Sequence, residues 1–181
     1  GLLFEINNLI ESGKIESLPV FLDSPLAITV TSIYRSFTRY LRPDVQAQIA
    51  SGDDIFDFKG LKFTSTTSES NAIKAEKRAK IIIAGSGMSH GGRIRRHEKE
   101  YLDETNTTLL LVGYQSVGSI GRLLQDGAKS IMIDGEKVKV RAKIEAIRGF
   151  SGHADRDQLV GLVEGGAQKA KQVVVVMGEE R

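Results

Sequence analysis

The sequence predicts an α/β fold, with a mostly parallel sheet flanked by helices, from two observations. Short apolar runs typical of strands alternate with segments whose apolar residues recur at helical spacing. Several of these runs are apolar throughout, as expected for parallel strands covered on both faces. Strands that alternate with helices in this way favour a parallel sheet with helices on either side.

Four apolar runs are the strands of the predicted sheet: 19–22, 61–64, 80–84 and 108–114. The run 80–84 is a continuous apolar strand that we expect to be buried on both faces, and the run 108–114 is expected to be a further buried strand. The all-valine run 173–176 is expected to form a further strand near the C-terminus.

Helices are predicted between the strands. Apolar residues at helical spacing over 2–10 are followed by Gly13, which is a stop signal. Ser24 is a candidate N-cap, with Pro25 at the first helical position, for a helix that extends to Phe37. Further helical segments begin in the following ranges: 68–73, 92–97, 118–124 and 157–163.

The pattern changes after residue 129. Asp134 and Gly135 separate the run 130–133 from an alternating run over 137–147, which predicts a β-hairpin with a type I′ turn. The whole of 137–147 is expected to be strand. The acidic segment 51–57 is expected to be a surface loop.

Composition limits the class of protein. The 181 residues are 40% hydrophobic and 27% charged, which is ordinary for a globular protein, and the net charge is +2. There is no cysteine, which excludes disulfides and thiolate metal sites and is compatible with the cytoplasmic location that we expect. No apolar run approaches the length of a membrane span, and the N-terminus does not have the pattern of a signal peptide. The chain lacks an initiator Met and begins within a helical pattern, and it stops just after a predicted strand. We therefore expect a fragment of a longer protein.

A glycine-rich segment, 85–92, lies between the predicted strand 80–84 and the next helix. Such a turn presents backbone N–H groups at the positive end of a helix, which suits a phosphate. Ser86, Gly87 and Arg93 are therefore candidate phosphate contacts. A dinucleotide site is the alternative, but the glycines at 85, 87 and 91 miss its spacing by one residue. The remaining interpretation is a turn that needs glycine for geometry alone.

A second segment, 113–119, has the same layout and supplies Gly118 and Arg122 as candidate contacts. Because the carboxyl ends of parallel strands meet at one edge of a sheet, we expect both loops at the same end. The alternative is that Tyr114 and Gln115 line a domain contact.

The turn over 149–155 places His153 between small residues, with Ser151 before it and Asp155 after it. Histidine exchanges protons most readily near neutral pH, and functional groups are often held on such loops. The alternative is a solvated turn histidine. Of the other histidines, His97 is expected to be solvated on a charged helix, and His90 is a weaker ligand candidate. No histidine pair has the spacing of zinc ligands.

Several segments together resemble the β-CASP nucleases of the metallo-β-lactamase superfamily. They are Pro19-Val20-Phe21-Leu22-Asp23-Ser24-Pro25-Leu26-Ala27, Ala84-Gly85-Ser86-Gly87-Met88 with Gly91-Gly92-Arg93, Val112-Gly113-Tyr114-Gln115, and 149–155. The resemblance is strongest to bacterial and archaeal relatives of the cleavage and polyadenylation endonuclease subunit. It covers essentially the whole chain, in order.

The resemblance implies a zinc hydrolase domain of αββα type with an inserted α/β cap. Residues 1–148 would be the β-CASP cap and 149–181 the returning segment of the hydrolase domain. His153 would lie beside a two-zinc centre as proton donor to the leaving group, and Ser151 near the scissile phosphate. The partner expected is RNA in single-stranded form, with no membrane and with a second copy of the chain in a homodimer.

The resemblance also implies no metal ligand within this fragment. The main metal-binding motif of the family precedes residue 1, and so does the acidic partner of His153. Where the family has Val-His-Gly-Glu, this chain has Val176-Met177-Gly178-Glu179. Since a thioether is a poor zinc ligand, Met177 puts full zinc occupancy in question. A zinc-dependent ribonuclease is the leading hypothesis, with an inactive fragment, and a catalytically degenerate scaffold or RNA-binding module is the alternative.

Overall fold

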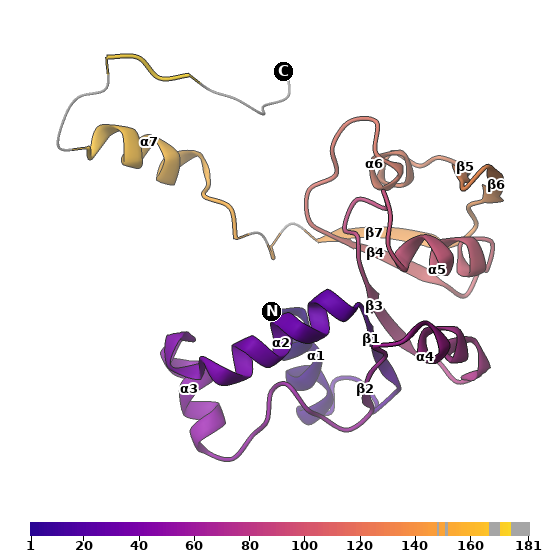
Figure 1. The fold of residues 1–181 in the computed structure, drawn as a ribbon, viewed down its shortest axis with the longest axis horizontal. Helices are drawn as coiled ribbons and strands as arrows, with labels where there is room; N and C mark the ends of the chain where they lie inside the picture. Colours follow the sequence, from indigo (N-terminus) through magenta and orange to yellow (C-terminus); the bar gives the residue numbers. More distant parts are fainter. Residues whose placement is uncertain (148, 151, 167–170, 175–181) are drawn as a thin grey trace. The chain divides into compact units, whose positions relative to one another are not determined.

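The computed structural model describes residues 1–147, 149–150, 152–166 and 171–174. The chain divides into two compact units, residues 1–150 and 151–181 (Figure 1), and each is described by itself. The predicted α/β class is confirmed, because in the described residues of the first unit parallel sheets are flanked by helices. The boundary proposed at residue 148 stays a prediction.

The first sheet is parallel and has the order β2-β1-β3. Its strands are β1 (Val20–Asp23), β2 (Leu61–Phe63) and β3 (Ile81–Ala84). Every residue of the central strand β1 is buried, whereas β3 is only half-buried. The expectation that β3 is buried on both faces was therefore wrong, because β3 is an edge strand of this sheet.

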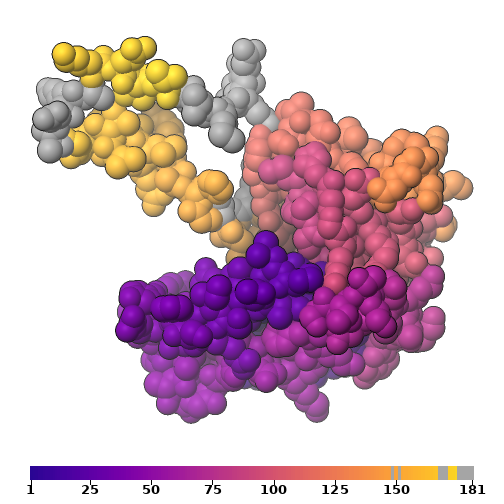
Figure 2. All heavy atoms as spheres, viewed as in Figure 1, coloured from indigo at the N-terminus to yellow at the C-terminus, as the bar shows by residue number. Residues whose placement is uncertain are grey.

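The helices of this region are α1 (Leu2–Glu11), α2 (Pro25–Ser36), α3 (Pro43–Ala50) and α4 (Thr67–Ala72), with 3₁₀ turns at Thr38–Tyr40 and Ile73–Ala75. The predicted cap of α2 is confirmed, since the Ser24 side chain accepts a hydrogen bond from Ala27 N at 3.3 Å. α2 has no buried residue, and its indigo-to-violet atoms lie on the visible face in Figure 2. Ile6 of α1 packs with Val20 and Phe58 in one core cluster.

The second sheet pairs β4 (Thr108–Val112) in parallel with β7 (Lys143–Ile147). Only Leu111 of β4 is buried, so the expectation of a buried strand was wrong here too. Both predictions inferred burial from an apolar run alone, although burial also depends on which elements cover the faces of the sheet.

The hairpin joins β5 (Ser130–Ile133) to β6 (Glu136–Lys139) in antiparallel pairing. Asp134 and Gly135 have φ of 52° and 79°, as the predicted type I′ turn requires. The run 137–147 is not one strand, however. Arg141 N and Ala142 N both donate to the Leu102 carbonyl, at 2.8 and 2.9 Å, and this contact ends β6 and sends the chain on to β7 beside β4.

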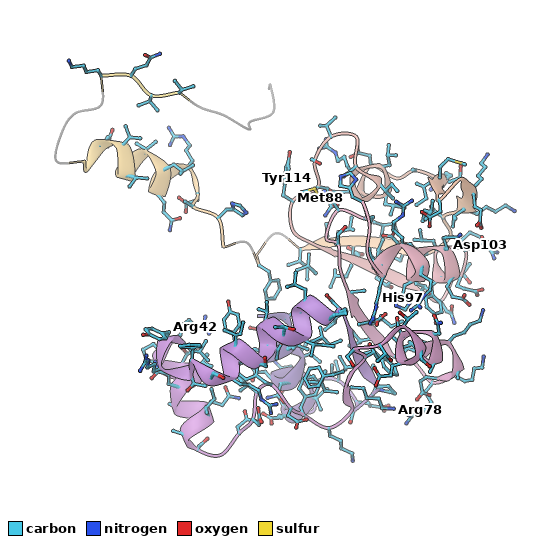
Figure 3. The ribbon with its side chains drawn as sticks, viewed as in Figure 1. Arg42, Arg78, Met88, His97, Asp103 and Tyr114 are labelled. Carbon is cyan, nitrogen blue, oxygen red and sulfur yellow. The ribbon has the colours of Figure 1, made fainter. Side chains whose placement is uncertain are left out.

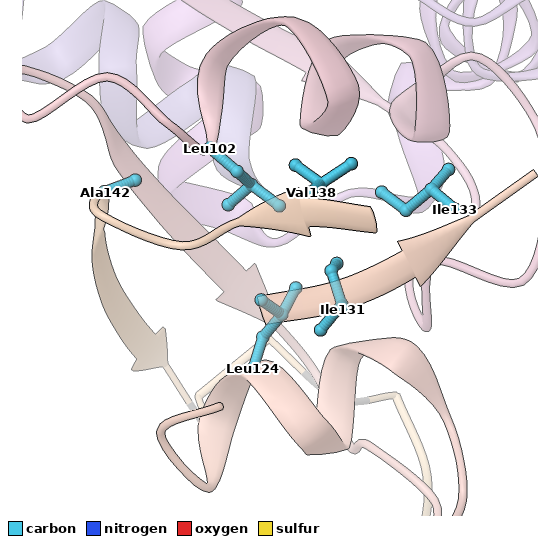
Figure 4. Close-up of a cluster of buried hydrophobic side chains, with 6 residues drawn as sticks. All are labelled: Leu102, Leu124, Ile131, Ile133, Val138 and Ala142. Carbon is cyan, nitrogen blue, oxygen red and sulfur yellow. The ribbon is translucent and has the colours of Figure 1, made fainter. Parts of the chain in front are cut away.

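A second core cluster holds the hairpin against helices α5 (Ile94–Tyr101) and α6 (Ile120–Gln125). Leu124 of α6 and Ile133 of β5 are completely buried in it (Figure 4). The other buried members are Leu102, Ile131, Val138 and Ala142. This cluster fixes the base of α6, and therefore the loop that leads into it.

In the second unit, the predicted helix is confirmed as α7 (Arg156–Glu164). Asp155 caps it, accepting from Gln158 N at 2.8 Å while Asp155 N donates to the Gln158 side chain at 2.9 Å. The prediction of a strand over 173–176 was wrong for Val173 and Val174, which are not in a strand. Val175 and Val176 lie outside the described residues.

Candidate functional site

The first glycine loop, residues 85–92, follows the carboxyl end of β3 and leads into α5. It folds back on itself, because Ser86 N donates to the Gly91 carbonyl at 3.2 Å and Gly91 N donates to the Ser86 hydroxyl at 3.3 Å. Gly92 has φ of 72°, and a Cβ there would lie 2.5 Å from the Gly85 carbonyl oxygen, so this position requires glycine. Ser86 and Gly87 are exposed at the outer side of the loop.

The base of this loop is anchored by a buried pair. The Ser89 hydroxyl donates to the Glu98 carboxylate of α5, and both side chains are buried. Burial raises the pKa of Glu98, while the Ser89 hydrogen bond and the charge of Arg95 oppose that shift. The buried Ser89–Glu98 hydrogen bond therefore fixes the loop to α5 beneath its exposed residues.

Arg93 follows the loop, and its guanidinium binds within the protein. Nη1 donates to Asp23 Oδ1 at 2.7 Å and to the Thr64 carbonyl at 2.6 Å, and Nη2 donates to the Ser65 carbonyl at 2.8 Å. Its side chain is 20% exposed. A phosphate contact by Arg93 stays a prediction, and such a contact would have to be shared with these internal partners.

The second loop, residues 113–119, follows the carboxyl end of β4 and leads into α6. Gly118 has φ of 82°, and the Ser119 hydroxyl caps the helix by accepting from Arg122 N at 3.0 Å. The Arg122 guanidinium lies at the surface, where Nε donates to both carboxylate oxygens of Asp126 at 3.1 and 3.0 Å. Gly118 is exposed, and the side chain of Arg122 is 34% exposed.

The two loops meet, although their strands belong to different sheets. Gln115 Nε2 donates to the Gly87 carbonyl at 2.8 Å, and Gly121 N donates to the Met88 carbonyl at 3.3 Å. Figure 3 labels Met88 and Tyr114 on these two loops. The expected common sheet was wrong, because β3 lies in the β2-β1-β3 sheet and β4 pairs with β7.

Sequence reasoning missed the carboxylate of Asp23, at the carboxyl end of β1. This side chain is fully buried and accepts hydrogen bonds from Thr64 Oγ1 at 2.8 Å and Ser70 Oγ at 2.5 Å, besides the bond from Arg93. Arg96 Nη2 approaches it at 3.4 Å. We call Asp23, Thr64, Ser70, Arg93, Arg96 and His97 the Asp23 cluster.

His97 belongs to this cluster, so the expectation of a solvated histidine was wrong. Its side chain, labelled in Figure 3, is 8% exposed. Its Nε2 lies 2.6 Å from Asp23 Oδ2. Burial lowers the pKa of His97, and the hydrogen bond and charge of Asp23 only partly offset that effect. His97 is thus neutral near pH 7 and donates Nε2–H to the carboxylate.

The Asp23 carboxylate is ionised over the ordinary range of pH. Burial acts to raise its pKa, but the hydrogen bonds from Ser70, His97, Thr64 and Arg93 outweigh burial and bring the pKa to about 2. The cluster therefore joins β1, the end of β2, α4 and α5 through one buried negative charge.

The predicted catalytic turn is described only in part. His153 is exposed in the second unit, and Ser151 lies outside the described residues, as does Met177. The carboxylate of Asp155 caps α7. His90 is exposed on the first loop, with its carbonyl accepting from Arg95 Nη1 at 3.1 Å.

Within 1–147, 149–150, 152–166 and 171–174, no group of three or more His, Asp or Glu side chains is placed to hold a metal ion. These residues by themselves therefore do not fit a zinc centre. No helix in the same part of the chain is long and apolar enough to cross a membrane.

Two family models match the sequence. The model of the Beta-Casp domain matches residues 1–124, and the model described as the Zn-dependent metallo-hydrolase RNA specificity domain matches residues 137–181. The first covers all of α1 to α5, both glycine loops and the Asp23 cluster. The second covers β7, the His153 turn and α7.

Curated relatives match nearly the whole chain. Ribonuclease TTHA0252 of Thermus thermophilus is 36% identical over 92% of this chain and 38% of its own length. The RNase J-like protein of Methanocaldococcus jannaschii is 32% identical over 98% of this chain and 40% of its own. Transcription termination factor FttA of Methanosarcina mazei is 31% identical over 95% of this chain and 28% of its own. The chain thus spans well under half the length of these relatives.

Proposed function

Since this chain belongs to the β-CASP family of metallo-β-lactamase-fold ribonucleases, we propose that it is the RNA-gripping part of a zinc-dependent ribonuclease. The substrate proposed is single-stranded RNA, cleaved at its phosphodiester bonds. One observation carries the proposal most: two glycine loops, each at the carboxyl end of a parallel strand, lie against each other through Gln115. Ligands bind at this end of α/β sheets.

The grip is proposed to use both loops. The exposed Ser86, Gly87 and Gly118 let a phosphate approach the backbone closely, and Arg122 adds a positive charge at the surface. Contacts to phosphates position RNA without reading its sequence. This part of the protein would therefore hold the RNA backbone rather than select a base.

The chemical step is proposed to use His153 as general acid and Ser151 as a contact to the scissile phosphate. Water attacks phosphorus and loses a proton to the solvent, the bond to the 3′ oxygen breaks, and His153 gives its proton to that oxygen. The description of the second family model as Zn-dependent supports zinc as the cofactor. Because the described residues do not fit a zinc centre, its ligands would come from outside them, and residues 1–181 alone would be inactive.

The test is RNA cleavage by the longer protein that carries this chain. His153→Ala should lower kcat by about 100-fold or more and change KM little, because general acid catalysis contributes about that much. An unchanged kcat would remove His153 from the step. Residues 1–181 alone, with zinc added, should not cleave the same RNA, and cleavage by them would contradict the proposed division of labour.

A degenerate scaffold or RNA-binding module is the second candidate. Met177, in place of the expected histidine, favours it, and one of the relatives bears the name of a termination factor rather than a nuclease. Metal analysis of the longer protein separates the two candidates. Two zinc ions per chain would support the enzyme, and none would support the scaffold.

A further inference from the structure

Gln115 is the buried side chain through which the two glycine loops are joined. It is 3% exposed, and its Nε2 donates to the Gly87 carbonyl of the first loop at 2.8 Å and lies 3.4 Å from the Gly113 carbonyl of its own loop. One amide group thus contacts both loops at once. Gly87 is among the residues proposed to contact phosphate, so this contact acts directly on the proposed grip.

Two further contacts converge on the same short segment. Gly121 N donates to the Met88 carbonyl at 3.3 Å, and Ser116 Oγ lies 3.3 Å from Met88 Sδ. Gly87 and Met88 are therefore held by two residues of the second loop, Gln115 and Ser116, and by Gly121 just after it. The separation of the two loops is fixed by these contacts rather than by pairing of β3 with β4, which belong to different sheets.

The space for the Gln115 amide is provided by Gly121 of α6. A Cβ at this position would lie 1.8 Å from Gln115 Oε1 and 2.8 Å from its Cδ. Glycine is unfavourable inside a helix, and the backbone of Gly121 does not have a positive φ that would require it. The absence of a Cβ at Gly121 is thus needed for the glutamine side chain.

Packing alone does not account for a glutamine here. Among the described residues, Gln115 Oε1 is one of the buried polar atoms that lack a hydrogen-bond partner. An unsatisfied buried oxygen costs free energy, whereas an apolar side chain of similar size would not carry that cost. What the glutamine supplies, and an apolar residue cannot, is the hydrogen bond to the Gly87 carbonyl.

We propose that Gln115 is a positioning residue that sets the spacing of the two glycine loops, so that one RNA strand can contact both. This inference rests on the proposed function, because it assumes that the loops hold the RNA backbone. Gln115 itself does not touch the RNA. Its loss should weaken the grip on RNA and leave the chemical step largely unchanged.

Two substitutions in the longer protein test the contact from either side. Gln115→Glu keeps the size of the side chain but replaces the donor with an oxygen that faces the Gly87 carbonyl. Gly121→Ala keeps the glutamine but places a methyl group where its amide lies. Each should raise KM and Kd for single-stranded RNA by about tenfold or more and change kcat by less than about threefold, since a roughly tenfold loss of affinity is on the scale of one lost hydrogen bond.

The pH dependence of RNA binding gives a second test of the contact. A protonated glutamate at position 115 can again donate a hydrogen bond to the Gly87 carbonyl. Burial raises the pKa of a glutamate, so Gln115→Glu should recover part of its RNA affinity as the pH is lowered from about 8 to about 6. Gln115→Ala should not recover over the same range. The matched control is Gln125→Glu, the same exchange at an exposed position of α6, which should bind RNA as the wild type does.

The outcomes separate this inference from the proposed function. A wild-type protein that neither binds nor cleaves RNA would overturn both. A wild-type protein that binds RNA, with Gln115→Glu and Gly121→Ala variants that bind equally well, would overturn only the role of Gln115. Loss of kcat and RNA affinity in proportion to loss of folded protein would also overturn it, because that result indicates a purely structural side chain.

Discussion

The first and second glycine loops have the same layout in the sequence, but their arginines are used differently. Arg93 lies under the first loop and binds a buried carboxylate and two backbone carbonyls. Arg122 lies at the surface beside the second loop, where it binds Asp126 four residues later. The shared layout of strand, glycine turn, helix and arginine thus predicts the course of the backbone. It does not predict which group the arginine binds.

The difference follows from what surrounds each loop. The first loop lies beside the carboxyl end of β1, where Asp23 is fully buried and must be paired. The second loop leads into α6, which packs on a core of apolar side chains, and the Arg122 guanidinium binds the exposed Asp126. We therefore expect buried charge pairing to hold the first loop and apolar packing to hold the helix that follows the second.

Replacement of the Asp23 carboxylate is expected to have the largest effect on stability. Asp23→Asn keeps the size of the side chain but leaves Arg93 and Arg96 without their counter-charge, and should lower the free energy of unfolding by about 3–5 kcal/mol. The matched exchange at the second loop, Asp126→Asn, breaks an exposed pair and should cost less than about 1 kcal/mol. Urea unfolding measures both, and equal losses would contradict the comparison.

The glycines of the two loops should differ next. Both Gly92 and Gly118 have positive φ, which costs a residue with a side chain about 1–2 kcal/mol. A Cβ at Gly118 meets nothing within 4 Å, whereas at Gly92 it would lie 2.5 Å from a backbone oxygen. Gly92→Ala should therefore cost about 2–4 kcal/mol and Gly118→Ala only the backbone term. Similar values for the two variants in thermal unfolding would argue against a tightly closed first loop.

Exchanging arginine for lysine sharpens the comparison further. A lysine at position 93 has no planar fork with which to reach Asp23 and the Thr64 and Ser65 carbonyls together. Arg93→Lys should therefore lower stability by about 1–3 kcal/mol. Arg122→Lys should leave stability within about 0.5 kcal/mol, because an exposed ion pair contributes little. A neutral Arg93→Lys exchange would show that the buried contacts of Arg93 are dispensable.

The smallest effect is the dependence of stability on pH. The pKa of His97 is lowered from its ordinary value of 6.5, so the folded state favours the neutral ring. Its contribution is complete above pH 6.5 and is lost as the pH falls through the lowered pKa. The pKa of Asp23 is lowered from 3.8 to about 2 by folding. The stability that Asp23 contributes is therefore lost only as the pH falls from 3.8 towards about 2.

Acidification from pH 7 to pH 5 should therefore destabilise the chain through His97 before it reaches Asp23. His97→Gln retains a donor for Asp23 but cannot be protonated in this range, so its stability should change less between the two pH values. Equal pH dependence of the variant and the wild type, measured by urea unfolding, would exclude the neutral buried histidine.

Local signals in the sequence were enough for much of the fold. Ser24 and Pro25 predicted the start of α2, and Asp134-Gly135 predicted the hairpin, because each depends on a few neighbouring residues. The run 137–147 was wrongly predicted to be one strand because the prediction also used only neighbouring residues. Its alternation continues through Val140 to Ala142, and the break depends on the carbonyl of Leu102, about 40 residues earlier.

The candidate site was predictable only in its backbone. The glycine loops were identified from their spacing, but His97 looked solvated because its neighbours in the sequence are charged. Its partner, Asp23, is 74 residues away. The available signal was an aspartate directly after the apolar run Val20-Phe21-Leu22, since a carboxylate that ends a buried strand has to be paired.

The most direct test of the central claim is crosslinking of single-stranded RNA that contains photoreactive bases to the wild-type longer protein, followed by mass spectrometry of the peptides. If the two loops form one grip, crosslinks should occur in both 85–92 and 113–119. They should also be competed by unlabelled single-stranded RNA. Crosslinks in only one of these loops, or in neither while the RNA is bound, would contradict the account.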